Sequence, residues 1–177
     1  MELFSSPSMP FYKFGDVIYL QKIEEKYWVS FIKKRFRETG KEITPEQSRR
    51  IAQLMENHPY FVQQLAQQTW LVCRKKCTDK DIDKAVENLW NQNTILFQRE
   101  TDNLTNMQLN YLKALCNDEK HLSASETLQN YKLGTSANVI RTKEALEKKE
   151  IIDAVGPEIE FIDPLYKTWL KKIYFRS

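Results

Sequence analysis

The sequence predicts a mainly α-helical protein in which a helical bundle is followed by a winged helix-turn-helix with a small β-hairpin as its wing. Three observations support this prediction. Apolar residues recur at helical spacing along most of the chain, several helix starts carry capping residues, and the elements after Thr105 follow the order helix, helix, turn, helix, hairpin, helix. With 177 residues, the chain can form one medium domain or two small ones.

The first helix is expected to begin near Glu24 and to end at Gly40, after an irregular start that contains a short β-like run at Asp16–Leu20. Its inward stripe is predicted from residues at i, i+3, i+4, i+7 and i+8, which are Trp28, Phe31, Ile32, Arg35 and Phe36. Three more helices should follow in the first half of the chain. Thr44 and Gln47 have the spacing of a capping box, the segment Asn57–Pro59 separates two helices, and Thr78 should cap a long helix that reaches Phe97.

In the second half, Thr105 and Gln108 have the spacing of another capping box. A short helix is predicted to be capped at Ser123, and Gly134 should form the turn before the next helix. That next helix is predicted to bury Val139, Thr142 and Leu146, together with Ile151 beyond its end.

Two strands, Ile151–Val155 and Glu158–Ile162, are expected to form the hairpin. Asp163 should then cap a final helix, with Pro164 at its first position and an inward face of Leu165, Trp169 and Ile173. The boundary between the all-α part and the winged helix is expected near Asp102–Thr105.

The composition excludes several classes of protein. Hydrophobic residues make up 41% of the chain and charged residues 29%, as in a globular protein rather than a disordered one. No stretch approaches the roughly 18 consecutive apolar residues of a membrane span, and the first residues lack the pattern of a signal peptide, so a cytoplasmic protein is expected. The net charge of +3 permits contact with nucleic acid without arguing for it.

The four glycines argue against a standard phosphate-binding loop. Gly15, Gly40, Gly134 and Gly156 lie far apart, whereas a Walker A loop or a dinucleotide fingerprint needs glycines close together, because bare backbone N–H groups must surround the phosphates. We therefore expect this chain alone to hold no cofactor and to have no enzymatic activity.

Cysteine and histidine are also scarce. Cys73 and Cys77 have a spacing that could serve a metal, but the only histidines are His58 and His121, and no second cysteine pair is present. Together with Cys116, these cysteines are expected to be ordinary reduced thiols, with no metal bound. No nucleophile motif accompanies either histidine, so no catalytic residues are predicted.

The segment "GTSANVIRTKEALEKKEIID" (134–153) is the candidate recognition helix. An asparagine suits adenine and an arginine suits guanine, and phosphate contacts normally supply much of the affinity. The candidate DNA- or partner-binding residues are Ser136, Asn138, Ile140 and Arg141, with Lys171 and Lys172 from the last helix. Against DNA binding, Glu144 and Glu147 dilute the positive charge of the helix, and the wing carries Glu158 and Glu160. From the residues alone, double-stranded DNA and a protein partner remain equally favoured.

Three short motifs, in order, resemble a known family. The segment "SSPSMPFYKFGDVIYLQKI" is similar to the stretch that leaves the ATPase core in archaeal-type ATPases of the AAA+/STAND group. The segment "ENHPYFVQQLA" (56–66) resembles their helical lid motif, and "FIDPLYKTWL" (161–170) resembles the end of their C-terminal winged helix. Two positions depart from the family pattern, because Asn57 and Glu150 stand where glycines are usual, so the turn at Glu150 should be built differently.

The resemblance implies that the chain is the C-terminal part of such an ATPase, with the P-loop core preceding it. Residues 1–23 would end the core, residues 24–102 would form a helical lid-type bundle, and residues 103–177 would form the winged helix. The lid would sense ATP and Mg²⁺ held by the core through Asn57, His58 and Pro59, and would pass the nucleotide state to a DNA- or protein-binding output. The alternatives are a free-standing winged-helix DNA-binding transcriptional regulator and a protein-interaction module, which exposed aromatic residues within 166–175 would favour.

Overall fold

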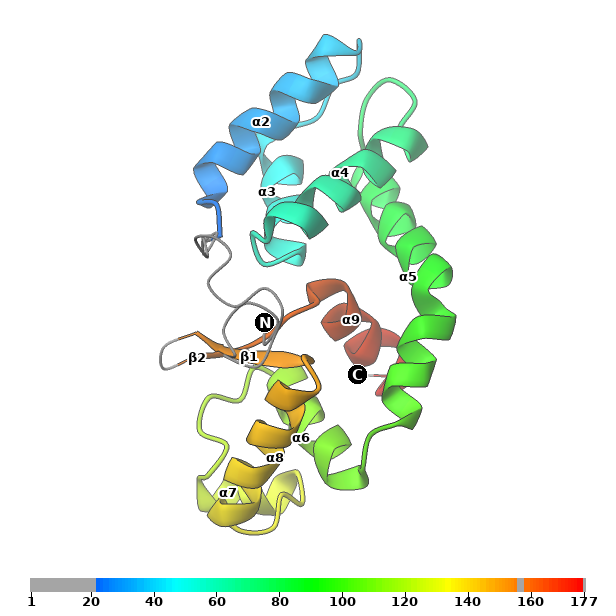
Figure 1. Ribbon diagram of the computed structural model, residues 1–177. Helices are drawn as coiled ribbons and strands as arrows, with labels where there is room; N and C mark the ends of the chain where they lie inside the picture. Colours follow the sequence, from blue (N-terminus) through cyan, green and yellow to red (C-terminus); the bar gives the residue numbers. More distant parts are fainter. Residues whose placement is uncertain (1–21, 156–157, 177) are drawn as a thin grey trace, which may run out of the picture.

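The computed structural model describes residues 22–155 and 158–176. It confirms a mainly helical protein with a two-stranded antiparallel hairpin near its C-terminal end, as a winged helix requires (Figure 1). The expected β-like run at Asp16–Leu20 and the turn of the wing at residues 156–157 lie outside the described residues.

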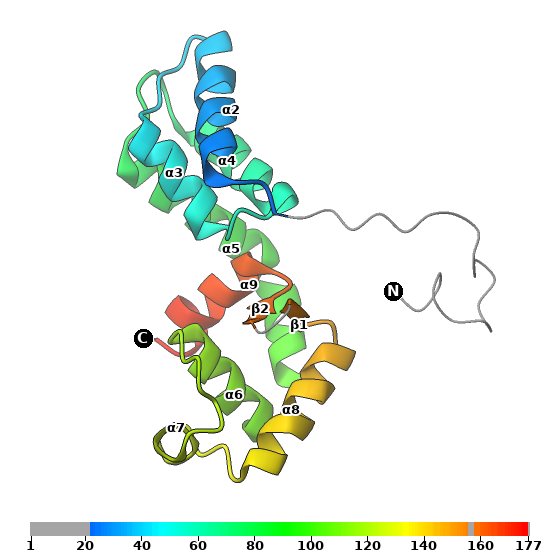
Figure 2. The same ribbon diagram turned by 90° about the vertical axis from the view of Figure 1, so that its left-hand side faces the viewer.

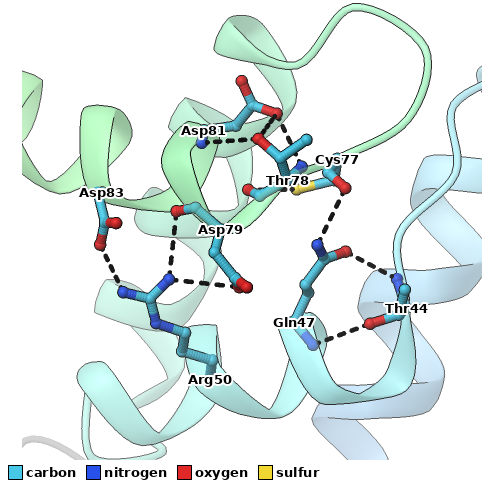
Figure 3. Close-up of polar contacts among 8 residues, drawn as sticks. All are labelled: Thr44, Gln47, Arg50, Cys77, Thr78, Asp79, Asp81 and Asp83. Carbon is cyan, nitrogen blue, oxygen red and sulfur yellow. Dashed lines mark hydrogen bonds and ion pairs between the residues drawn. The ribbon is translucent and has the colours of Figure 1, made fainter.

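From residue 22 on, the N-terminal part is a bundle of four helices, which are α2 (Glu25–Glu38), α3 (Pro45–Leu54), α4 (Pro59–Val72) and α5 (Asp79–Asp102). The structure confirms the capping box at Thr44, whose hydroxyl accepts from the Gln47 backbone N–H while the Gln47 side chain accepts from the Thr44 backbone. It also confirms Thr78 as the cap of α5, with Asp81 as its reciprocal partner. Figure 3 shows these two helix starts facing each other. They are linked because Gln47 Nε2 donates to the Cys77 carbonyl at 2.9 Å and Arg50 reaches the acidic first turns of α5.

The core of the bundle lies where α2 packs on α3 and α4 packs on α5. Trp28, Ile32 and Phe36 of the predicted α2 stripe are buried, but Phe31 and Arg35 are exposed, so that part of the prediction is wrong. The stripe is narrower than predicted because α2 lies at the edge of the bundle, at the end of the molecule away from the winged helix (Figure 1).

Most of the helices that the structure describes end in the same way, with at least one residue in the left-handed conformation just beyond the cap. Gly40 takes this position after α2, with φ of +74°, and the next N–H returns to the Phe36 carbonyl. Non-glycine residues take the same position elsewhere, including Glu56 after α3 and Lys132 after α7 (Ser125–Asn130). A chain with few glycines therefore ends its helices by placing other residues in the left-handed conformation. These residues are strained relative to glycine.

The turn after the candidate recognition helix α8 (Ser136–Lys148) corrects one expectation. Glu150 adopts φ of +56°, its N–H donates to the Glu147 carbonyl, and the Ile151 N–H donates to the Leu146 carbonyl. This is the hydrogen-bond pattern of a glycine-terminated helix. The prediction that this turn is built differently is therefore wrong, because a glutamate adopts the glycine conformation.

Helix α5 is longer than predicted and contacts both parts of the protein (Figure 2). Its first half buries Ile82 and Leu89 against the bundle, and its second half buries Phe97 and Thr101 against α9 (Pro164–Trp169). Two polar contacts reinforce the second junction, since the Thr101 and Tyr166 hydroxyls lie 2.8 Å apart and Trp90 Nε1 donates to Thr168 Oγ1 at 3.1 Å.

The remaining elements follow the winged-helix order. They are α6 (Asn106–Cys116), α7, α8, β1 (Ile152–Val155), β2 (Glu158–Phe161), α9 and a π-helical turn, η1 (Leu170–Tyr174). The capping box at Thr105 and Gln108 is confirmed. The prediction of a cap at Ser123 is wrong, because α7 begins at Ser125 behind Ala124, without a side-chain cap.

The hairpin pairs Ile152 with Phe161 and Val155 with Glu158. Each strand is one residue shorter than predicted, although the Ile162 N–H still donates to the Ile151 carbonyl. After the hairpin, Asp163 caps α9 as predicted, by accepting from the Leu165 and Tyr166 N–H groups. Ile173 is 46% exposed rather than inward, because the wide turn of η1 rotates it away from the stripe of Leu165 and Trp169.

Candidate nucleic-acid interface

The turn between α7 and α8 fixes the start of the candidate recognition helix. Gly134 has φ of +74°, a backbone conformation that favours glycine, and a Cβ at this position would lie 2.6 Å from the Asn138 side-chain nitrogen, so that amide would have to move. Leu133 before it is buried, which anchors the turn in the core. Thr135 then caps α8, because its hydroxyl accepts from the Asn138 backbone N–H.

Helix α8 has one buried face and one exposed face. Val139, Thr142 and Leu146 are buried, and Ile151 beyond the helix is buried with them, as predicted. On the opposite face, Ser136, Ile140 and Arg141 are exposed, with Ile140 exposed to 57%. Sequence reasoning did not single out Lys148, which is also exposed on α8.

Arg141 has no hydrogen-bond or ion-pair partner within residues 22–155 and 158–176, so its guanidinium is available to a ligand. Asn138 is placed differently from Arg141. It is only half exposed, and its side-chain oxygen accepts from the Thr135 hydroxyl at 3.1 Å, so the amide takes part in the cap of α8. The structure thus gives Arg141 the freer side chain of the two candidate base-reading residues.

The charges near α8 are mixed. Lys143 pairs with Glu147 along the helix at 3.5 Å, which leaves Arg141 and Lys148 as its exposed cations without a partner among the residues described. On the wing, Glu158 is exposed, whereas Glu160 lies 2.7 Å from Lys22 of the N-terminal part. This ion pair neutralises one of the two wing glutamates that the sequence set against DNA binding.

Lys171 and Lys172 do not belong to the exposed face of α8. They lie in η1, which packs on α6, whereas Arg141 lies on α8. Lys171 Nζ lies 3.6 Å from Asp118, which follows α6. These two lysines therefore belong to a different element from Arg141.

The predicted nucleotide-sensing residues Asn57, His58 and Pro59 form the connection between α3 and α4. Asn57 adopts φ of +59°, and Glu56 before it has φ of +47°, so two consecutive non-glycine residues are left-handed. The Asn57 carbonyl accepts from Trp28 Nε1 at 3.2 Å. His58 packs its ring against Phe61, and Pro59 is the first residue of α4.

Two polar atoms of this connection are buried without a hydrogen-bond partner in the part of the chain that the structure describes, namely Asn57 Oδ1 and His58 Nδ1. Such atoms are uncommon in folded proteins and call for an explanation, such as an ordered water or a bound ion; the Tyr111 hydroxyl and Trp169 Nε1 are orphaned in the same way. Burial and the nearby Lys22 ammonium lower the pKa of His58, although Asp163 opposes them.

An ion-pair cluster that sequence reasoning missed joins this connection to the winged helix. Lys167 Nζ of α9 lies 2.8 Å from Glu56 and 3.5 Å from Asp118, and Lys22 pairs with both Glu56 and Glu160. Burial lowers the pKa of Lys167, but its hydrogen bond to Glu56 and the nearby carboxylates outweigh that effect and raise it. Both partners lie inside segments that resemble motifs of the AAA+/STAND ATPases, Glu56 in 56–66 and Lys167 in 161–170. The sequence therefore singled out both segments, although it did not indicate that these two residues pair.

Within the described ranges, no helix is both long enough and apolar enough to cross a membrane. Comparisons with curated proteins and with solved structures gave no match. A family model described as a probable winged helix domain matches residues 82–172, from the first half of α5 to η1. Because this match covers just over half of the chain and the helices and hairpin have the winged-helix order, the chain belongs to this family of winged helix domains.

Proposed function

We propose that this chain binds double-stranded DNA through the exposed face of α8 and is the output part of a nucleotide-regulated protein. The observation that carries the first half of the proposal is the position of Arg141, which is exposed on the second helix of a helix-turn-helix without a partner among the described residues. Arginine at such a position can donate two hydrogen bonds to guanine or can contact phosphate. Ser136 near the helix start and Lys148 near its end offer further phosphate contacts.

The test is the affinity of the purified chain for a mixed-sequence DNA duplex, measured by fluorescence anisotropy at low and rising salt. Binding should weaken with salt, and Arg141→Ala should lower the affinity about tenfold, since one good arginine contact is worth about 1–3 kcal/mol. Arg37→Ala is the matched control, because Arg37 is also exposed but lies on α2, at the far end of the molecule (Figure 1). Equal loss in both variants, or no binding at low salt, would contradict the proposal and favour a protein partner.

The second half of the proposal rests on the junction between the two parts. The connection that resembles a nucleotide-facing lid motif is bonded to the winged helix through Glu56 and Lys167 and carries two orphaned polar atoms. A ligand or an ATPase core that contacts Asn57, His58 and Pro59 would therefore act on residues next to the winged helix. In this proposal residues 24–102 are the lid-like part and residues 103–177 the output, and the chain alone does not hydrolyse ATP.

This relay is tested with the full reading frame, joined to any P-loop core that precedes the chain. DNA affinity should then differ between the ATP-bound and ADP-bound forms, and Lys167→Met should reduce that difference. A free-standing regulator, the second candidate, predicts DNA binding that is indifferent to nucleotide. ATP turnover by the present chain alone, lost on mutating one of its own residues, would contradict the non-catalytic role.

A further inference from the structure

Two thiols and a carboxylate meet where α4 joins α5. One ligand atom from each of Cys73, Cys77 and Asp81 lies within 4.8 Å of the other two. Cys73 caps the end of α4, Cys77 directly precedes the cap of α5, and Asp81 lies in the first turn of α5. The cysteines are 2% and 7% exposed, and Asp81 is half-buried. The sequence offered only the two cysteines, and the fold adds the third group.

The segment that carries these groups is held at both ends. Lys41 Nζ donates to the carbonyls of Cys73 and Trp70. Glu42 exchanges backbone hydrogen bonds with the other end, because its N–H donates to the Lys75 carbonyl and its carbonyl accepts from the Cys77 N–H, each at 2.8 Å. The Gln47 side chain donates to the Cys77 carbonyl, as Figure 3 shows. The backbone that positions both sulfurs is therefore fixed before any ligand arrives.

We propose that Cys73, Cys77 and Asp81 form a binding site for a thiophilic divalent cation of the Zn²⁺ class, with water as the fourth ligand. Two thiolates and one carboxylate are ligands that Zn²⁺ accepts in a tetrahedral site. In a tetrahedral site, Zn–S bonds of about 2.3 Å and a Zn–O bond of about 2.0 Å imply separations of about 3.8 Å between the sulfurs and about 3.5 Å from sulfur to oxygen. Since the three ligand atoms lie within 4.8 Å of one another, the side chains need to close by at most about 1.3 Å.

The surroundings fit a bound cation. The Asp81 carboxylate already accepts from the Thr78 N–H and hydroxyl at one of its oxygens, which fixes its orientation, as groups behind a metal ligand commonly do. Binding releases one proton from each thiol, and the two thiolates with Asp81 leave the Zn²⁺ complex with one net negative charge. The Lys41 ammonium, which bonds the Cys73 carbonyl, lies where it offsets that charge. Without a cation, burial keeps both thiols neutral, since it raises the pKa of Cys73 and brings that of Cys77 to about 12.

The test is a Co²⁺ titration of the whole reduced chain, monitored by absorption. A thiolate-to-cobalt charge-transfer band and the visible bands of tetrahedral Co²⁺ should appear with one equivalent of metal and should disappear on addition of Zn²⁺. Cys73→Ser should abolish the charge-transfer band or weaken Co²⁺ binding at least a hundredfold. Asp81→Asn should weaken it about tenfold while retaining the cap, because an amide oxygen can still accept from the Thr78 N–H.

Cys116→Ser is the matched control, because Cys116 is equally buried but packs beside α9, with its sulfur 3.7 Å from the Lys167 carbonyl. This variant should bind Co²⁺ like the original chain, and circular dichroism of each variant shows whether it is folded. Absence of the charge-transfer band in the folded original chain would overturn the proposal. It would also be overturned if Cys116→Ser lost the band, or if Cys73 and Cys77 formed a disulfide in air and bound no Co²⁺ when reduced.

Discussion

Lys167 of α9 and Glu56 of the α3–α4 connection are 111 residues apart in the sequence, yet their side chains form a hydrogen-bonded ion pair of 2.8 Å. Both side chains are about three-quarters shielded from solvent, at 23% and 24% exposure. Glu56→Gln should therefore lower the free energy of unfolding by about 1–2 kcal/mol, because it leaves a partly buried ammonium with weaker partners. Urea unfolding followed by circular dichroism measures this change.

Glu38→Gln is the control for this substitution. Glu38 pairs with Arg35 on the surface of α2, where the side chains are 44% and 64% exposed, and exposed pairs contribute less than about 1 kcal/mol. A double-mutant cycle with Lys167→Gln isolates the pair itself. A coupling energy near zero would show that Glu56 and Lys167 do not hold the two parts together.

The two faces of α8 should respond oppositely to truncation. Leu146 is fully buried, so Leu146→Ala should cost about 2–5 kcal/mol of stability through lost burial and the cavity left behind. Ile140 is 57% exposed, so Ile140→Ala should change stability by less than about 0.5 kcal/mol. Thermal unfolding of both variants checks this difference. A large loss for Ile140→Ala would mean that this face packs against the rest of the chain and is not free for a ligand.

The left-handed residue after α7 offers a stabilising substitution. Lys132 is exposed and has φ of +52°, a conformation that glycine adopts without steric cost. Lys132→Gly should raise the free energy of unfolding by about 0.5–1 kcal/mol. Lys132→Ala removes the same side chain but keeps a Cβ, so it should bring no such gain. If both variants were equally stable, backbone strain at this position would not be the cause.

Much of the fold could be predicted because its signals are local. The capping boxes at Thr44 and Thr105 and the cap at Asp163 each depend on residues within three positions of one another, and the structure confirms all three. The failures come from tertiary context. Phe31 has the correct helical spacing for burial but stays 38% exposed among the described residues, and a π-turn rotates Ile173 outward.

In the candidate sites, too, features set by local sequence could be predicted and features set by tertiary contacts could not. The exposed position of Arg141 follows from helical periodicity around Val139 and Leu146, so the sequence could predict it. The sequence indicates Asn138 as a base-reading residue and does not predict its part in the helix cap. That role depends on the position of the Thr135 hydroxyl at the start of α8, which donates to the Asn138 side-chain oxygen. The pairs of Glu56 with Lys167 and of Lys22 with Glu160 join distant segments, and no local pattern in one sequence specifies them. Of the aromatic residues within 166–175 that would favour a protein-binding surface, Tyr166 and Trp169 are buried against α5, whereas Tyr174 is 39% exposed.

The stability of the protein should depend on pH through His58. Burial and Lys22 hold the pKa of His58 below its ordinary value of 6.5, so the folded chain binds this proton less readily than the unfolded chain does. The stabilisation from neutral His58 is thus complete above about pH 6.5 and is lost as the pH falls from there through the lower folded pKa. The original chain should lose more stability between about pH 7.5 and about pH 5.5 than His58→Gln does.

His121→Gln is the control, because His121 is the other histidine of the chain and is exposed. It should retain the full pH dependence of the original chain. Asp163 also faces His58, and its pKa is raised by burial and lowered in part by the charge of His58. The comparison of the two histidine variants therefore isolates His58 together with its coupling to Asp163. If His58→Gln and His121→Gln showed the same slope of stability against pH, His58 would be titrating as it does in the unfolded chain, and the α3–α4 connection would be open to solvent.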